Sequence, residues 1–516
     1  MKKVLFLLLL VHQGWAQTVS NSSQVKQPLD SLSIYNRQLY PDEMKQDLRL
    51  FLNIRKKVNS GLYRYHTKKQ IDSIYKWAFR KVRQSMSTLD FYKIILQLTD
   101  FEGSCHNYTE PEADLVGYLS RQHGFFPFAL KYIEGNIIFN SKTAQIPVGS
   151  RVMSINGISD KELMQSFYKY ITTDGFTRTE KLSSSVNNSY GLRYVYEYGL
   201  RDSFIIRFIA PGASQQQTVT VPAVSLEERK ANLILRHSAP VDSVTDYSVQ
   251  PKYSFKMVNP STGLLNLRIF SMATGADDPA FPIYVAFIDS VFQALSKNNI
   301  PNLILDIRGN PGGSDPTFEQ PMMYLTDSSF KENILAYTIF DDGIPYEEYF
   351  WGISTAEKMD STAKADGKRM LKDYFPGLHN GKNMQNAYYN PVYHPKNPGF
   401  KGKLYLLIDE DVASAASHLA SLVKAYARNV TIVGVETVGG YYGHNGHMSL
   451  IYELPNSKIK TKFSTVFVVQ DALAKPDQPE GRGIIPDYTV WPSFGDFMQN
   501  RDTQMEYVLK LIEADR

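Results

Sequence analysis

A serine at a predicted strand-to-helix junction is the first candidate for chemistry. The run from Leu404 to Ile408 is continuously apolar, which is typical of a strand buried on both faces. From Val412 onward, small and apolar residues recur at helical spacing, and Ala is frequent. Ser414 therefore lies at or near the turn, where backbone N–H groups can stand beside a nucleophilic hydroxyl. Taken alone, the stretch slightly favours a plainer interpretation, in which Ser414 is a small residue that lets a helix pack closely.

Four histidines are candidates for the general base that a serine nucleophile needs. His106 lies in a Gly-containing loop that follows a predicted helix. His418 comes four residues after Ser414 on the same predicted helix, and we interpret it as a packing residue because a helix points both side chains outward. His444 and His447 could form a metal pair, but no third ligand motif accompanies them. An exposed loop is the favoured interpretation for these two, which remain the fallback base.

The composition is that of a globular protein with two or three domains. The 516 residues are 43% hydrophobic and 21% charged, with a formal net charge of +4. So small a net charge indicates no polyanionic partner, and no nucleic-acid partner is predicted. The sequence has no phosphate loop and no cysteine cluster, and we predict neither a metal nor another cofactor. The lone Cys105 excludes an intrachain disulfide, so core burial must stabilise the fold.

The first 16 residues have the pattern of a secretory signal peptide. Lys2 and Lys3 precede a short apolar run, which Gly14-Trp15-Ala16 closes with small residues. The apolar run is too short to span a bilayer, and no later stretch is long and apolar enough to do so. We therefore expect an exported protein without a transmembrane anchor, in the periplasm or outside the cell. The lack of disulfides favours a bacterial envelope.

The remaining chain divides into four regions by the pattern of its residues. Residues 17–114 are predicted to be mainly helical, because apolar residues recur at spacings of three and four. Residues 115–224 show short alternating runs between turn residues, which indicates a β-rich unit. Residues 225–252 are polar and are predicted to be a connector. Residues 253–516 alternate strands and helices, which indicates a layered α/β domain, and within it the polar and aromatic segment 314–398 is predicted to be a rim or lid.

One stretch of the β-rich unit resembles a known module. Residues 146–164, I-P-V-G-S-R-V-M-S-I-N-G-I-S-D-K-E-L-M, combine a tight turn, a short strand, an Asn-Gly turn and a helix. This resembles the core signature of a PDZ domain, which takes a peptide C-terminus as an added strand. The resemblance implies that the unit grips a polypeptide substrate near its C-terminus. An unrelated small β-rich insertion is the alternative.

Three motifs in one order resemble the carboxyl-terminal processing (tail-specific) serine peptidase family. They are L-I-L-D-I-R-G-N-P-G-G at 303–313, D-V-A-S-A-A-S at 411–417, and E-T-V-G-G at 436–440 followed by E-G-R-G-I-I-P-D at 480–487. The resemblance extends from about residue 40 to the C-terminus, and the motifs are specific in combination. It implies a crotonase-like (ClpP-like) layered α/β catalytic domain, with an N-terminal helical segment and an inserted PDZ-like β-rich domain.

The resemblance also implies a nucleophile and an oxyanion hole. Ser414 takes the position of the family's nucleophile, and the N–H groups of Gly312 or Gly313 and of Ala415 take the positions of the oxyanion donors. Glycines suit this role, because a backbone N–H can approach a substrate carbonyl with no Cβ in the way. Each such donor is typically worth about 2–4 kcal/mol.

The general base separates two branches of the family. One branch uses a Lys in a T-x-G-K-G loop, but Gly440 stands at that position here, and we reject a Ser-Lys dyad. The other branch, which includes the tricorn core protease, uses a His before the insert and a Glu near the G-x-x-P-D stretch, at positions that are His106 and Glu480 here. The resemblance implies that His106 takes the proton from Ser414 and that Glu480 orients the ring, directly or through another hydroxyl. Cys105 stands where the tricorn protease has a Ser.

Other residues of the motifs receive structural interpretations. Glu436, which follows a buried strand, is the alternative to Glu480 as the carboxylate that orients His106. Asp306 and Arg308 are predicted to form an ion pair or a turn brace. Cys105 is disfavoured as a nucleophile paired with His106, because adjacent side chains usually diverge.

The sequence thus predicts an exported serine endopeptidase that hydrolyses polypeptides through an acyl-enzyme. The rival is a non-catalytic protein that binds a peptide or another ligand on the same fold, which also resembles retinoid-binding modules. One geometric expectation separates the two, because a peptidase needs a ring nitrogen of His106 near the Ser414 hydroxyl.

Overall fold

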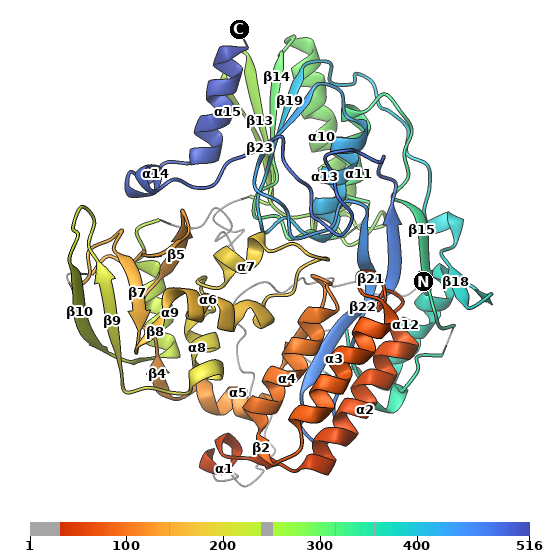
Figure 1. The fold of residues 1–516 in the computed structure, drawn as a ribbon. Coiled ribbons are helices and arrows are strands. Elements are labelled where there is room, and N and C mark those ends of the chain that lie inside the picture. The colour runs from red at the N-terminus through yellow and green to blue at the C-terminus, as the bar shows by residue number, and fades with distance from the viewer. Residues whose placement is uncertain are drawn as a thin grey trace.

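The structure, a computed structural model, describes residues 31–143, 145–238, 251–314, 316–341, 343–353 and 358–515 (Figure 1). The predicted signal peptide lies outside the described residues, as does much of the predicted connector. Within the described ranges, no helix combines the length and the apolar character needed to cross a membrane.

A six-stranded sheet forms the middle of the C-terminal region. Its strand order is β12-β13-β14-β19-β20-β23, and only β12 runs antiparallel to its neighbour. β14 and β19 are adjacent and parallel, so the loops that follow them emerge at the same edge. The predicted α/β class of this region is confirmed. The strands are β12 (Tyr253–Asn259), β13 (Thr262–Leu267), β14 (Asn302–Asp306), β19 (Lys403–Ile408), β20 (Val430–Gly434) and β23 (Tyr488–Thr489).

Helices cover both faces of this sheet (Figure 1). One face carries α10 (Ala280–Lys297), α11 (Glu319–Leu325) and α13 (Ser414–Tyr426), and the other carries α15 (Thr503–Ala514), which follows the short α14 (Phe494–Met498). Burial on both faces explains why β14 and β19 are continuous apolar runs. Because α13 is itself buried over most of its length, packing fixes the place where it begins.

A seven-stranded sheet packs against the N-terminal helices. Its order is β16-β21-β22-β15-β18-β17, with β3 paired to β22. The described part of the region predicted to be mainly helical, residues 17–114, contains α2, α3 and α4, which share one core with this sheet. The segment 314–398 is more than the predicted rim or lid, because it supplies β15 in the interior of this sheet and the wholly buried α11. The elements are α2 (Pro41–Val58), α3 (Lys68–Lys81), α4 (Thr88–Phe101), β3 (Tyr108–Glu110), β15 (Asn333–Thr338), β16 (Phe350–Gly352), α12 (Ser361–Tyr374), β17 (Leu378–His379), β18 (Lys382–Met384), β21 (Gly443–Glu453) and β22 (Lys460–Gln470).

The region 115–224 contains a third sheet with a hydrophobic core of its own. Its order is β10-β9-β7-β6-β5, with β8 paired to β7. The predicted Asn-Gly turn is present between β7 and β8, where Asn156 and Gly157 have φ values of +51° and +81°. The PDZ resemblance of this unit stays a prediction. The elements are β5 (Leu130–Ile133), β6 (Asn136–Phe139), β7 (Arg151–Ile155), β8 (Ile158–Ser159), α6 (Asp160–Phe167), α7 (Thr179–Ser184), α8 (Tyr190–Tyr198), β9 (Ser203–Ile209) and β10 (Gln216–Pro222).

A buried arginine joins the end of β14 to the last helix. The Arg308 guanidinium donates to both oxygens of Asp306, at 2.9 and 2.7 Å, and to both oxygens of Asp502, at 2.7 and 2.7 Å. Asp502 is also the N-cap of α15, where it accepts a hydrogen bond from the Met505 N–H. The predicted Asp306–Arg308 pair is confirmed, and Asp502 extends it to a residue far along the chain.

Replacing this arginine should destabilise the fold strongly. Arg308→Met leaves the buried Asp306 carboxylate without its partner, so the free energy of unfolding should fall by about 3–5 kcal/mol. Urea unfolding followed by circular dichroism measures the change. Lys403→Met is the matched control, because Lys403 pairs with Asp515 at the other end of the same helix but in an exposed position, and it should change the unfolding midpoint little. Equal losses in the two variants would contradict the assignment.

Candidate active site

Ser414 is held in an unusual backbone conformation at the first residue of α13. Its φ is +50°, in the left-handed region that costs a residue other than glycine about 1–3 kcal/mol. The preceding Ala413 is extended, and its N–H donates to the Asn310 carbonyl at 3.2 Å, while the Ser417 hydroxyl donates to the Ser414 carbonyl at 2.8 Å. A sharp strand-to-helix turn of this kind projects a serine hydroxyl out of the fold.

The glycine loop after β14 packs directly on this turn. Gly312 has a φ of +100°, and a Cβ there would lie 2.7 Å from the Ser414 Cβ and 2.9 Å from the Ala415 nitrogen. Only a residue without a side chain permits so close an approach. The loop is braced by Asn310, whose amide donates to the Leu267 carbonyl at 2.9 Å. The structure therefore brings Gly312, Ser414 and Ala415 together, as the sequence motifs predicted.

The hydrogen bonds of the loop distinguish the two glycines as oxyanion donors. The Gly312 N–H already donates to the Asn310 side-chain oxygen at 2.8 Å. The Gly312 carbonyl and the Ser314 N–H both bond to Phe270, at 2.8 and 3.0 Å, so the N–H of the intervening Gly313 points the opposite way. The Ala415 N–H lies in the first turn of α13, where it has no acceptor within the helix. The N–H groups of Gly313 and Ala415 are thus the two amides that these backbone hydrogen bonds leave available to an oxyanion.

His106 reaches this region from the N-terminal part of the chain. It is buried, and its Nδ1 lies 3.5 Å from the Cys105 Sγ. Its ring stacks on His444, with ring centroids 5.5 Å apart, and His444 lies 6.0 Å from His418. His418 is one turn along α13 from Ser414. Ring contacts through His444 therefore connect His106 to His418 on the helix whose first residue is the candidate nucleophile. The expected approach of a His106 ring nitrogen to the Ser414 hydroxyl stays a prediction.

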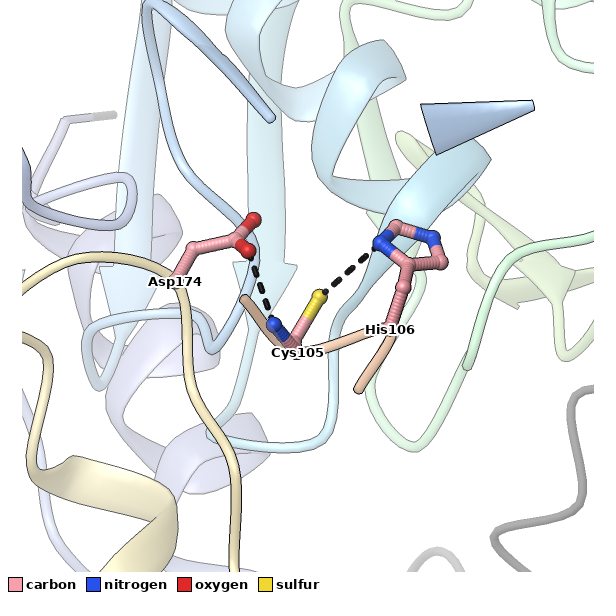
Figure 2. A group of neighbouring side chains, drawn as sticks. All are labelled: Cys105, His106 and Asp174. Atoms are coloured by element: carbon pink, nitrogen blue, oxygen red, sulfur yellow. Dashed lines mark hydrogen bonds between the residues drawn. The ribbon is translucent and has the colours of Figure 1, made fainter. Parts of the chain in front are cut away.

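Asp174 is a buried carboxylate next to His106 that sequence reasoning missed. One of its oxygens accepts from the Cys105 N–H and the other from the Gly440 N–H, each at 2.9 Å. Figure 2 shows Cys105 between Asp174 and His106, with the sulfur directed at the imidazole. Burial raises the pKa of Asp174 to about 6. An Asp-Gly pair in a loop is ordinarily a turn signal, and only the contact with residues 105 and 440 distinguishes this one.

Glu480, the carboxylate predicted from the sequence, is exposed on its loop. It lines a cavity of about 520 Å³ together with Arg64, Tyr65 and Gly440. The competing Glu436 is committed elsewhere, because it forms a two-bond ion pair with Arg482 at 2.7 Å and accepts from the Gly483 N–H. Glu436 therefore holds the loop that carries Glu480.

At Gly440, where the other branch of the family has its lysine, neighbouring atoms leave no room for a side chain. A Cβ at Gly440 would lie 2.6 Å from the Gly443 carbonyl oxygen and 3.6 Å from the Tyr65 hydroxyl. A lysine could not be placed here without moving these neighbours. This crowding agrees with the rejection of a Ser-Lys dyad.

The other three candidate histidines, His418, His444 and His447, lie near one another beside His106. The Nε2 of His418 lies 2.7 Å from the Glu332 carbonyl oxygen, and burial lowers the pKa of His418 to about 3. His418 is therefore a packing residue, as the sequence predicted. The expectation that His444 and His447 lie on an exposed loop is wrong, because both belong to β21. His444 is buried and accepts a hydrogen bond from the Gln470 amide at 2.9 Å. The long strand forms because it pairs with β22 over almost its whole length.

Comparisons with known proteins agree with this arrangement. Residues 263–490 match the sequence profile of peptidase family S41. No curated protein matches the chain. Among solved structures, mature CPAF complexed with lactacystin has a TM-score of 0.57 at 16% identity, covering 91% of this chain and 98% of that chain. A mutant form of CPAF has a TM-score of 0.59 at 15% identity, covering 91% and 96%. These structural likenesses establish the fold over nearly the whole chain.

The matched residues include Ser414, the glycine loop and Glu480, whereas His106 and Asp174 precede them. The region that holds the strained serine and its glycine loop is thus a peptidase family S41 domain, which confirms the serine-type peptidase predicted from the sequence.

Proposed function

We propose that the protein is a serine endopeptidase in which Ser414 attacks the substrate carbonyl and forms an acyl-enzyme that water then hydrolyses. The observation that carries the proposal is the left-handed backbone of Ser414 against Gly312. The N–H groups of Gly313 and Ala415 stabilise the oxyanion. Strain at a single serine, supported from both sides by the loop after β14 and by α13, is typical of a functional position.

His106 is the proposed general base. Its Nδ1 faces Cys105 and the side of Asp174, which leaves Nε2 as the atom that accepts the Ser414 proton. Two carboxylates compete to position the ring, and these are Glu480, implied by the family resemblance, and Asp174. The burial of Asp174 and its place beside His106 favour Asp174, since an interaction between charges is stronger away from water.

The substrate is proposed to be an extended polypeptide outside the cytoplasm. Export rests on the signal pattern of residues 1–16, and a grip on the substrate C-terminus rests on the PDZ resemblance of residues 146–164. The crotonase-like layering is likewise proposed from the family resemblance. The rival function, binding without catalysis, rests on the same fold and is decided by the activity of the purified protein.

Removing the nucleophile should abolish hydrolysis. Purified mature protein should cleave unfolded casein, and Ser414→Ala should lower kcat by roughly 10⁴- to 10⁶-fold, as expected for loss of a serine nucleophile. A serine-directed phosphonate should label the wild type at Ser414 alone. Ser421→Ala is the control, because Ser421 is a buried packing residue on the same helix and should retain activity and labelling. Wild-type protein that neither cleaves nor labels would support the binding protein instead.

The two carboxylates can be separated by kinetics. If Asp174 positions His106, Asp174→Asn should lower kcat by about 10²- to 10⁴-fold with little change in KM, and Glu480→Gln should have a much smaller effect on kcat. Because the pKa of Asp174 is about 6, the ratio of wild-type to Asp174→Asn activity should shrink as the pH falls through that value. A large kcat loss in Glu480→Gln with an active Asp174→Asn would reverse the assignment.

A further inference from the structure

Three side chains with different metal-binding chemistry converge beside the site. The thiol of Cys105, the imidazole of His106 and the carboxylate of Asp174 each offer one donor atom, and these atoms lie within 4.8 Å of one another (Figure 2). Cys105 and His106 come from the loop after α4, and Asp174 comes from the inserted region before α7. Adjacent side chains usually diverge, but here both neighbours turn toward the same point.

The spacing of the Cys105 and His106 donor atoms suits a zinc ion with one open position. Zn²⁺ binds sulfur, nitrogen and oxygen ligands tetrahedrally at about 2.0–2.3 Å, so ligand atoms around it lie roughly 3.3–3.8 Å apart. The Cys105 Sγ and the His106 Nδ1 are 3.5 Å apart, within that range. Three protein ligands and one free position are a common zinc arrangement.

The surroundings already orient the carboxylate ligand. Each oxygen of Asp174 accepts one backbone N–H, from Cys105 and from Gly440, which fixes its plane as outer hydrogen bonds do in metal sites. His106 and Asp174 are buried, and Cys105 is partly buried.

We propose that Cys105, His106 and Asp174 form an inhibitory site for Zn²⁺. The inhibition rests on the proposed role of His106 as general base. Zn²⁺ coordinates the lone pair of Nδ1, so the single proton of the neutral ring resides on Nε2, and Nε2 can no longer accept the proton of Ser414. Binding also releases the Cys105 thiol proton to solvent as the sulfur–zinc bond forms. The ion therefore inhibits by fixing the wrong tautomer of the base.

Cobalt substitution tests the site without any need for activity. Titration of the mature wild-type protein with Co²⁺ should give one bound ion per chain and a thiolate-to-cobalt charge-transfer absorption in the near ultraviolet. Cys105→Ser should lose this absorption, and Asp174→Asn should bind Co²⁺ more weakly by at least the roughly 10- to 100-fold that loss of an outer-shell partner costs. His394→Asn is the matched control, because His394 is an exposed histidine that bonds to Ser329, outside this group of side chains, and it should leave both measurements unchanged. Circular dichroism verifies that each variant is folded.

Zinc inhibition supplies the second measurement. Zn²⁺ should suppress casein cleavage and phosphonate labelling of the wild type, a chelator should restore both, and the ratio of activity with and without Zn²⁺ should be close to one in Cys105→Ser. Cobalt binding that lacks the thiolate absorption, or that persists in Cys105→Ser, overturns the site. Thiolate-linked binding without zinc inhibition of an active enzyme overturns the inhibitory role. A protein that binds Co²⁺ through Cys105 but never cleaves casein supports the metal site and refutes the proposed peptidase.

Discussion

The close approach of the glycine loop to the start of α13 is the constraint on which the site depends. Two backbones meet there with no side chain between them, at Gly312 on one side and at Ser414 and Ala415 on the other. The approach is possible because β14 and β19 are neighbours in parallel register, which brings their following loops to one edge of the sheet. The Gly309 N–H, which donates to both oxygens of Asp409 at 2.9 Å, ties the same two loops together. The buried sheet and α13 thus supply the rigidity that keeps a serine in a left-handed conformation.

The second half of the site is assembled from distant parts of the chain. Asp174 bonds to the N–H groups of residues 105 and 440, so one buried carboxylate joins the loop after α4, the inserted region and the loop between β20 and β21. Each charged or polar atom that is buried in this way needs a partner, and the backbone supplies it. His106 is positioned by these contacts and by the neutral ring of His444.

Much of the α/β region could be predicted from the sequence, because each of its elements is indicated by the residue pattern within its own segment. Parallel strands buried on both faces give apolar runs, and the strand predicted at Leu404–Ile408 is observed as β19, Lys403–Ile408. Ser414 and the glycines could be found because their motifs are contiguous. Asp174 could not, since an Asp in a turn is common and its function depends on residues about 70 and 270 positions away. The same limit applies to β15 and β21, whose pairing partners decide that they are strands.

Because Asp174 comes from the inserted region, the site depends on the order in which the parts of the chain fold. The inserted sheet has its own hydrophobic core, and so does the sheet of the S41 domain. Each of these cores could form while the other is still unfolded, but the surroundings of His106 are complete only after the two have docked. Contacts between residues so far apart in sequence form late, because the chain must first close long loops. We therefore expect the surroundings of His106 to form after the two sheets have folded. Partial separation of the two units would then inactivate the enzyme while leaving both units folded.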